Sequence, residues 1–195
     1  MAHRTRRFVI DCETNAINFD AWHKGDFSSL KSVHCLVAID ADTNKVYRFR
    51  EERVRDGIIW IFNQANEVIA HYAKFDVQVI ESYIGAKFPK EVVITCTQKM
   101  AKELFPNGYR EDRVPEGQRG RHKLETWGFR LGIHKGLFNK KTNPFSQYSD
   151  EMMEYCVRDC TVTLALHRFL SRRKRWGKLA SIFDYFSPIE EPQVA

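Results

Sequence analysis

Short apolar runs separated by polar turns dominate the first half of the chain, and they predict a series of β-strands. The runs with the length and composition of strands are residues 8–14, 33–39, 45–49, 67–71 and 92–94. The polar segment 40–44 joins the second run to the third and predicts a hairpin. The pattern therefore indicates a sheet of about five strands.

Helical periodicity lies between these runs and after them. A short helix is expected around residues 58–62, and a second helix is expected to enter at Asp76 and to stop at Gly85. A third passes through residues 100–104 and ends before a Pro-Asn-Gly turn. A meander of strands followed by alternating helix and strand predicts an α/β domain with a mixed central sheet flanked by helices, which is the order expected of an RNase H-like fold.

A long helix is expected from Ser149, a candidate N-cap, to about Arg172. One narrow face is mainly polar and predicts the solvent side, whereas the opposite positions form a broad apolar stripe. Asp159 falls within that apolar region, and Tyr155 lies one turn before it. An ionised carboxylate in an apolar surface costs several kcal/mol unless it is paired or coordinates a metal. Asp159 is therefore expected either to pair with Arg or Lys or to hold a cation.

The first strand ends in two acids, Asp11 and Glu13, on either side of Cys12. Alternate strand residues project to opposite faces, so the two carboxylates share one side. Like charges this close repel each other and raise each other's pKa unless a cation or hydrogen-bond donors compensate. The alternative interpretation is a strand end that reaches water and carries two solvated acids.

Asp76 adds a fourth acid at the junction of an apolar strand and a helix. Taken alone it is typical of an acid at a helix N-terminus, and His71 is typical of a partly buried histidine. The set of four acids, each at the end or inner face of an apolar element, predicts a metal site. Hard oxygen ligands suit Mg²⁺ or Mn²⁺, and two such ions can clamp a phosphodiester for attack by water.

Composition narrows the class of partner. The chain has 195 residues, which suits one domain over 1–195, and no apolar run approaches the length needed to cross a membrane. The net charge of +6, carried by clusters of Arg and Lys, suits a polyanion such as nucleic acid.

The five cysteines are scattered and predict reduced core thiols in a cytoplasmic protein, with Cys156 and Cys160 assigned to core packing. Residues 107–122 lack an apolar period and predict a mobile surface loop.

Three short motifs occur in order along the chain: Asp11-x-Glu13, Phe75-Asp76 and Tyr155-x-x-x-Asp159. As an ordered set they resemble the three motifs of the DEDDy-type proofreading 3′–5′ exonucleases. The segments 123–132 and 151–159 resemble the exonuclease domain of family A DNA polymerases from short-tailed bacteriophages. The resemblance covers residues 6–170, which is most of the chain.

The resemblance implies a two-metal site and stepwise release of nucleoside 5′-monophosphates from a DNA 3′ end. It places Asp11, Glu13 and Asp159 around one Mg²⁺ or Mn²⁺ ion, and Asp11 with Asp76 around a second. It further implies that Tyr155 and Glu13 orient the attacking water. Because a phenol with a pKa near 10 is a poor base at neutral pH, metal coordination is expected to supply most of the acidity of that water.

The resemblance also implies a set of nucleic-acid contacts at the site. The residues expected to make them are Thr14, His71, Phe75, Arg119 and Arg121. His71 departs from the pattern, because related enzymes commonly carry Asn there, and it could change how the terminal nucleotide is held. For the arginines, a solvated charged loop is an equal alternative.

The partner and substrate remain open at this stage. The resemblance suggests proofreading for a phage DNA polymerase in trans, in the host cytoplasm, because this chain begins at Met1 and stops soon after Trp176. The C-terminal tail 176–195 is apolar enough to cover the domain or to bind that polymerase, and packing on its own domain is favoured. A DEDD-type exoribonuclease and a non-catalytic nucleic-acid-binding subunit are the two alternatives.

Overall fold

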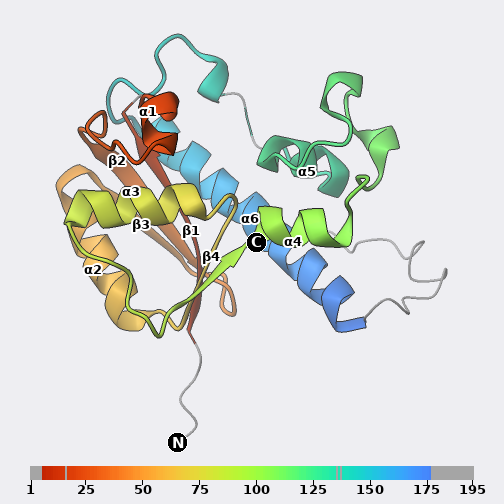
Figure 1. Cartoon of the computed structure of the whole chain (residues 1–195), viewed down its shortest axis with the longest axis horizontal. Helices are drawn as coiled ribbons and strands as arrows, with labels where there is room; N and C mark the ends of the chain where they lie inside the picture. The colour runs from red at the N-terminus through yellow and green to blue at the C-terminus, as the bar shows by residue number, and fades with distance from the viewer. Residues whose placement is uncertain (1–5, 16, 135, 137, 177–195) are drawn as a thin grey trace, which may run out of the picture.

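The structure is a computed structural model that describes residues 6–15, 17–134, 136 and 138–176. Its centre is a five-stranded sheet in the order β3-β2-β1-β4-β5 (Figure 1). The strands are β1 (Arg7–Thr14), β2 (Val33–Asp40), β3 (Val46–Arg50), β4 (Glu67–Ala70) and β5 (Val93–Cys96). The first three pair antiparallel, whereas β4 runs parallel to β1 and β5 parallel to β4. The predicted mixed sheet and RNase H-like fold are confirmed.

Helices cover both faces of this sheet. They are α1 (Phe19–His23), α2 (Val54–Gln64), α3 (Lys74–Ile84), α4 (Thr97–Leu104), α5 (Leu124–Leu131) and α6 (Asp150–Trp176). Four short 3-10 turns accompany them: η1 (Glu51–Arg53), η2 (Glu111–Arg113), η3 (Glu116–Gln118) and η4 (Phe138–Lys140). The long helix α6 crosses one face and contacts β1, β2 and β4, while α2 and α3 lie on the other (Figure 1).

The alternation of side chains along β1 determines which residues point to each face of the sheet. Phe8, Ile10 and Cys12 belong to the core cluster shared with α2 and α3, whereas Val9 belongs to the cluster under α6. Because side chains two apart share a face, Asp11 and Glu13 follow Val9 toward α6. The expectation that these two acids lie together, away from Cys12, is confirmed.

The junction between β4 and α3 differs from the sequence expectation. Helix α3 begins at Lys74, two residues before Asp76, so the prediction that the helix starts at the aspartate is wrong. Strand β4 ends at Ala70, and Tyr72 in the following turn has a φ of +63°, in the left-handed region, so the chain turns sharply there and enters the helix at Lys74. Asp76 still lies in the first turn of α3.

Several element bounds also shift, and two helices were missed. The expected helix at 58–62 is the centre of α2, and the expected strand at 92–94 is β5, one residue later. Helix α1 lies between β1 and β2, where no helix was expected, and the Asn18 side chain accepts a hydrogen bond from the backbone of Ala21. Helix α5 is eight residues long and contains a glycine, a threonine and two aromatic residues, all of low helix propensity.

The segment expected as a mobile loop, 107–122, carries η2 and η3 and buries three side chains, Tyr109, Val114 and His122. Its mobility stays a prediction. Tyr109 joins Trp127 and Phe169 in a third apolar cluster beneath α6, so the segment is anchored on the domain. Trp127 has no exposed surface. The predicted tail lies outside the described residues from position 177 on.

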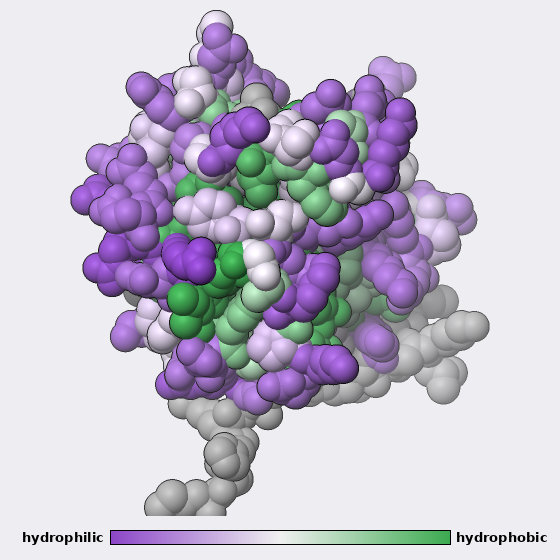
Figure 2. Space-filling view, turned by 60° about the vertical axis from the view of Figure 1, so that its left-hand side comes forward, coloured by the Kyte–Doolittle hydropathy of each residue, from purple (hydrophilic) through white to green (hydrophobic). Residues whose placement is uncertain are grey.

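The face in Figure 2 is mostly hydrophilic, with hydrophobic side chains visible in patches between charged ones. The large apolar side chains with the greatest exposure among the described residues are Phe19, Ile59, Tyr72, Val93 and Ile94. No helix in the described part of the chain combines the length and hydropathy needed to span a membrane.

Candidate active site

The end of β1 brings two acids into reach of helix α6. Asp11 and Glu13 are both half-buried, and one carboxylate oxygen of each lies within 4.8 Å of the other and of the Cys156 sulfur. The strand supplies both acids because its period of two gives them the same face. The helix supplies the thiol from its second turn.

Cys156 makes direct contact with the first acid. Its Sγ donates to the Asp11 backbone oxygen and to Asp11 Oδ2, both at 3.3 Å. The pKa of this thiol is well above its ordinary value because of burial, followed by its contact with Cys35 and the charge of Asp11, so the thiol is protonated and is a donor here. The sequence interpretation of Cys156 as a core residue was incomplete. Its spacing of three from Asp159, which places both on one face of α6, was a signal that could have found it.

Asp76 reaches the same region from the other side of the sheet. It is only 3% exposed, and the Cys12 thiol donates to its Oδ1 at 3.6 Å. Burial raises the pKa of Asp76 to about 7, and the charge of Asp159 also raises it, although hydrogen bonds to the carboxylate oppose this rise. Helix α3 therefore holds a carboxyl group against β1 at the strand end.

Asp159 completes the set from the third turn of α6. It is 3% exposed, and its position within the buried face of the helix confirms the sequence expectation. The pKa of the neighbouring Cys160 thiol is raised by burial and then by the charges of Asp11, Asp159 and Asp76. Asp11, Asp76 and Asp159 therefore all lie near enough to this buried sulfur to raise its pKa.

Tyr155 lies one turn before Asp159 and is also buried, at 7% exposure. Its ring packs against Phe138 of η4, with centroids 5.4 Å apart. This contact holds the aromatic ring between α6 and the preceding segment. The five residues predicted to be catalytic thus come from β1, α3 and α6, and the structure brings the four acids together at one end of the sheet.

The donor chemistry of this cluster fits a hard divalent cation. Carboxylate oxygens are the ligands that Mg²⁺ and Mn²⁺ prefer. A cation would stabilise the ionised form of Asp76, whose pKa is raised mainly by burial and also by the charge of Asp159. Asp11 and Glu13 are the half-exposed members of the set, so a cation and its waters can approach through them. Asp76 and Asp159 lie behind them in the core.

His71 engages the protein through both ring nitrogens. Nε2 donates to the His122 carbonyl at 2.9 Å, and Nδ1 lies 3.0 Å from Thr97 Oγ1. The ring therefore ties the end of β4 to α4 and to the end of the 107–122 segment. A nucleic-acid contact by His71 stays a prediction, but the structure shows a bridging role that the sequence did not reveal.

The other predicted contact residues fall in two places. Thr14 is buried and its hydroxyl donates to the Asn15 carbonyl at 2.9 Å, while Phe75 stacks on the exposed Phe19 with centroids 6.0 Å apart. Arg119 and Arg121 are exposed on the 107–122 segment. The first pair lies beside the acids in sequence and in space, whereas the arginines belong to a separate element.

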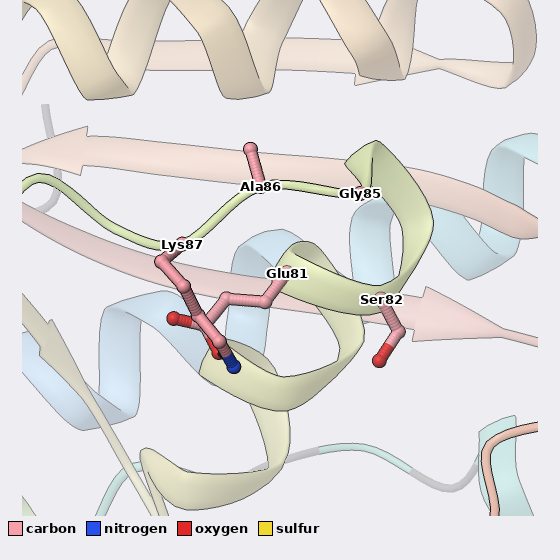
Figure 3. A pocket seen from close by; sticks show the side chains of 5 residues that line it. All are labelled: Glu81, Ser82, Gly85, Ala86 and Lys87. Carbon is pink, nitrogen blue, oxygen red and sulfur yellow. Dashed lines mark hydrogen bonds and ion pairs between the residues drawn. The ribbon is translucent and has the colours of Figure 1, made fainter.

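A small surface hollow lies at the far end of α3 from Asp76 (Figure 3). It is lined by Glu81, Ser82, Gly85, Ala86 and Lys87. Lys87 Nζ and Glu81 Oε2 form an ion pair at 2.6 Å within it. The hollow is separate from the acids.

No protein-family model matches the chain. The chain is 24% identical over 217 residues to the DNA-directed DNA polymerase of Escherichia phage T7, an alignment that covers 92% of this chain and 27% of the polymerase. The chain therefore spans about a quarter of the length of that relative. A solved structure described as the apo form of the nuclease matches with a TM-score of 0.60 and 16% identity, covering 89% of this chain and 75% of that chain. This likeness shows a shared fold.

Proposed function

We propose that the chain is a metal-dependent 3′–5′ exonuclease that acts on DNA. The observation that carries this proposal is the pair of acids Asp11 and Glu13 at the end of β1, with two buried acids close by. Asp76 of α3 accepts a hydrogen bond from Cys12 of the same strand, and Asp159 lies one turn of α6 after Cys156, which contacts Asp11. Clustering carboxylates is unfavourable unless cations neutralise them, and cations held by carboxylates are the usual means of hydrolysing phosphodiesters. The similarity to a DNA polymerase supports DNA as the substrate.

The roles proposed for the acids are those that the resemblance to the DEDDy-type exonucleases implies. Asp11, Glu13 and Asp159 would hold one Mg²⁺ or Mn²⁺ ion, and Asp11 with Asp76 would hold a second. When bound, the two ions lower the pKa of the attacking water and offset charge on the phosphate. Glu13 is half-exposed at the strand end and would accept a hydrogen bond from that water, with Tyr155 orienting it from α6.

The proposed substrate is a frayed or single-stranded 3′ end, as left by a DNA polymerase that needs its errors removed. The net charge of +6 favours approach of a polyanion despite the acids at the site. Phe75 and the exposed Phe19 offer an aromatic surface next to Asp76 on which an unpaired base can stack. A paired base offers no free face for such a contact.

The test measures the length of 5′-labelled DNA over time in the presence of the protein, first with Mg²⁺ and then with Mn²⁺. The DNA is used as a 3′-recessed duplex and as a single strand. We expect stepwise shortening from the 3′ end, which disappears with a chelator and in Asp11→Ala. The matched control is Asp112→Ala, which removes an exposed acid of η2 and is expected to retain full activity. Folded wild-type protein that shortens neither substrate with either metal would contradict the proposal and favour a binding subunit. Faster shortening of a matched RNA strand would contradict the choice of DNA.

A further inference from the structure

The proposed reaction leaves one group at the site without a role, the thiol of Cys156. This side chain is fully buried, yet its sulfur lies 3.3 Å from Asp11 Oδ2. The contact therefore goes beyond apolar packing, because the thiol donates a hydrogen bond to a carboxylate. Sulfur and carboxylate oxygen side by side are, however, the donor set of sites for zinc-like ions.

We propose that Asp11, Glu13 and Cys156 form a mixed oxygen–sulfur site that binds a thiophilic divalent cation, of the chemical class of Zn²⁺ and Cd²⁺. Binding of such an ion excludes the hard cation from Asp11 and Glu13, and so inhibits the enzyme. The second part of this inference rests on the proposed function, whereas the binding site itself does not.

The distances suit a shared ion. Zinc bonds of about 2.3 Å to sulfur and about 2.1 Å to oxygen, at a tetrahedral angle, place the two ligand atoms about 3.6 Å apart. The observed separation of Cys156 Sγ and Asp11 Oδ2 is 3.3 Å, and all three ligand atoms lie within 4.8 Å of one another. The remaining adjustment falls to Glu13, whose half-exposed side chain has room to rotate. No other group of three such donors meets this distance in the described part of the chain.

Coordination changes the bonding of the thiol in a defined way. The hydrogen bond from Cys156 to Asp11 breaks, the S–H proton passes to the buffer, and the sulfur electron pair forms the bond to the metal. Two carboxylates and one thiolate then face a doubly charged ion, and water supplies the fourth ligand. Mg²⁺ does not compete for sulfur, since it prefers oxygen donors.

A second buried thiol provides an internal control. Cys12 Sγ lies 3.6 Å from Asp76 Oδ1, so it also pairs sulfur with a carboxylate at this site. It points to the opposite face of the sheet and does not belong to the three-donor group. Cys12→Ser therefore tests whether any thiol beside an acid suffices.

The first experiment titrates the full chain with Cd²⁺ in the absence of Mg²⁺ and follows the ultraviolet charge-transfer absorption of the cadmium–thiolate bond. We expect the band to saturate at one Cd²⁺ per chain in wild type and in Cys12→Ser, and to be lost in Cys156→Ser. Asp11→Asn, which keeps the thiol, is expected to weaken Cd²⁺ binding at least about tenfold, because a charged ligand is lost. Circular dichroism confirms that each variant is folded. Absence of the band in wild type, or its persistence in Cys156→Ser, would overturn the site.

The second experiment measures inhibition of Mg²⁺-dependent digestion by Zn²⁺, with each protein normalised to its own rate without Zn²⁺. The Zn²⁺ concentration for half inhibition is expected to rise at least about tenfold in Cys156→Ser and to stay unchanged in Cys12→Ser. An unchanged value in Cys156→Ser would overturn the competition. If the wild type has no nuclease activity, the proposed function fails, and the absorption experiment still decides whether the site exists.

Discussion

The protein buries charge in two places, at the end of β1 and under the 107–122 segment, and it compensates the charge differently in each. Arg130 of α5 has no exposed surface and donates to Glu111 Oε1 at 2.7 Å and to the Arg121 carbonyl at 2.8 Å. Its guanidinium also lies 4.7 Å from the centre of the Trp127 ring. At the strand end, by contrast, Asp76 and Asp159 are buried with charges of their own sign nearby.

The pKa values show what this difference means. Burial raises the pKa of Glu111, but hydrogen bonds from Gly120 and Arg130 outweigh it, and the net pKa lies below its ordinary value. The pKa of Asp76 instead rises to about 7, mainly because of burial. A compensated charge stabilises the fold, whereas a cluster of like charges in the core destabilises it and is explained by a ligand of opposite charge.

The largest difference between the two regions is expected when a buried acid of the strand-end site is neutralised without changing its shape. We expect Asp159→Asn to lower the rate of metal-dependent DNA shortening by at least about 1,000-fold, because one ligand of the proposed site is lost. Its free energy of unfolding without metal is expected to stay equal to wild type or to rise, since a like charge is removed. Rates at saturating Mg²⁺ and urea melts in chelator measure both. A large loss of stability with retained activity would show that Asp159 serves the fold.

The opposite result is expected at the other buried charge. Arg130→Met keeps an apolar stem but removes the hydrogen bonds to Glu111 and to the Arg121 carbonyl, and we expect it to lower the free energy of unfolding by about 1–3 kcal/mol. The rate per folded molecule at saturating DNA is expected to change little, because Arg130 is separate from the acids. Urea melts with activity measured at low temperature test this. Glu111→Gln keeps an acceptor for Arg130 but removes its counter-charge, so it separates the hydrogen bond from the charge. A loss of stability as large as in Arg130→Met would show that the buried guanidinium needs the carboxylate.

Much of the strand-end site could be predicted because short-range geometry decides it. The period of two puts Asp11 and Glu13 together, and the helical period puts Asp159 on the buried face of α6. The contact between Cys156 and Asp11 was missed because it joins residues 145 apart in sequence. Its partners are set by how α6 crosses the sheet, which periodicity does not give.

The second region could hardly be predicted at all. Segment 107–122 has no apolar period, and it is anchored by hydrogen bonds to residues outside it, such as Arg130 and His71. In the sequence Arg130 is one more basic residue of a positively charged chain. Its burial becomes evident only when α5 packs beside α6, where Trp127 shields it.

The pKa of Asp76 gives a pH test of the same contrast. The carboxyl group titrates near pH 7 in the folded protein without metal and near pH 4 when unfolded, so the folded state holds an extra proton between these values. The free energy of unfolding without metal is therefore expected to fall as the pH rises from about 4 to about 7.

Asp76→Asn should remove the contribution of this group to the pH dependence and stabilise the metal-free protein at pH 8 by an amount on the order of 1–3 kcal/mol. Urea melts in chelator at pH 5 and pH 8 measure it. The exposed acid variant Asp112→Asn should keep the wild-type slope, and an equal slope in Asp76→Asn would contradict the assignment.

The smallest effect is expected from the exposed arginines of the second region, and it decides whether that region takes part in function. Arg119 and Arg121 are solvated, so each would contribute to DNA binding mainly through the phosphates, weakly and in a salt-dependent way. We expect the double variant Arg119→Ala with Arg121→Ala to raise the KM for single-stranded DNA about 3- to 10-fold at low salt, with kcat unchanged, and to reduce the dependence of KM on salt.

The matched control is Arg53→Ala with Arg55→Ala, which removes two exposed arginines beside the start of α2. Equal effects of the two double variants would reduce the role of segment 107–122 to general attraction by net charge. A larger effect at Arg119 and Arg121 would mean that the anchor at Arg130 holds a DNA-binding element beside the acids, so the two buried charges would serve one substrate.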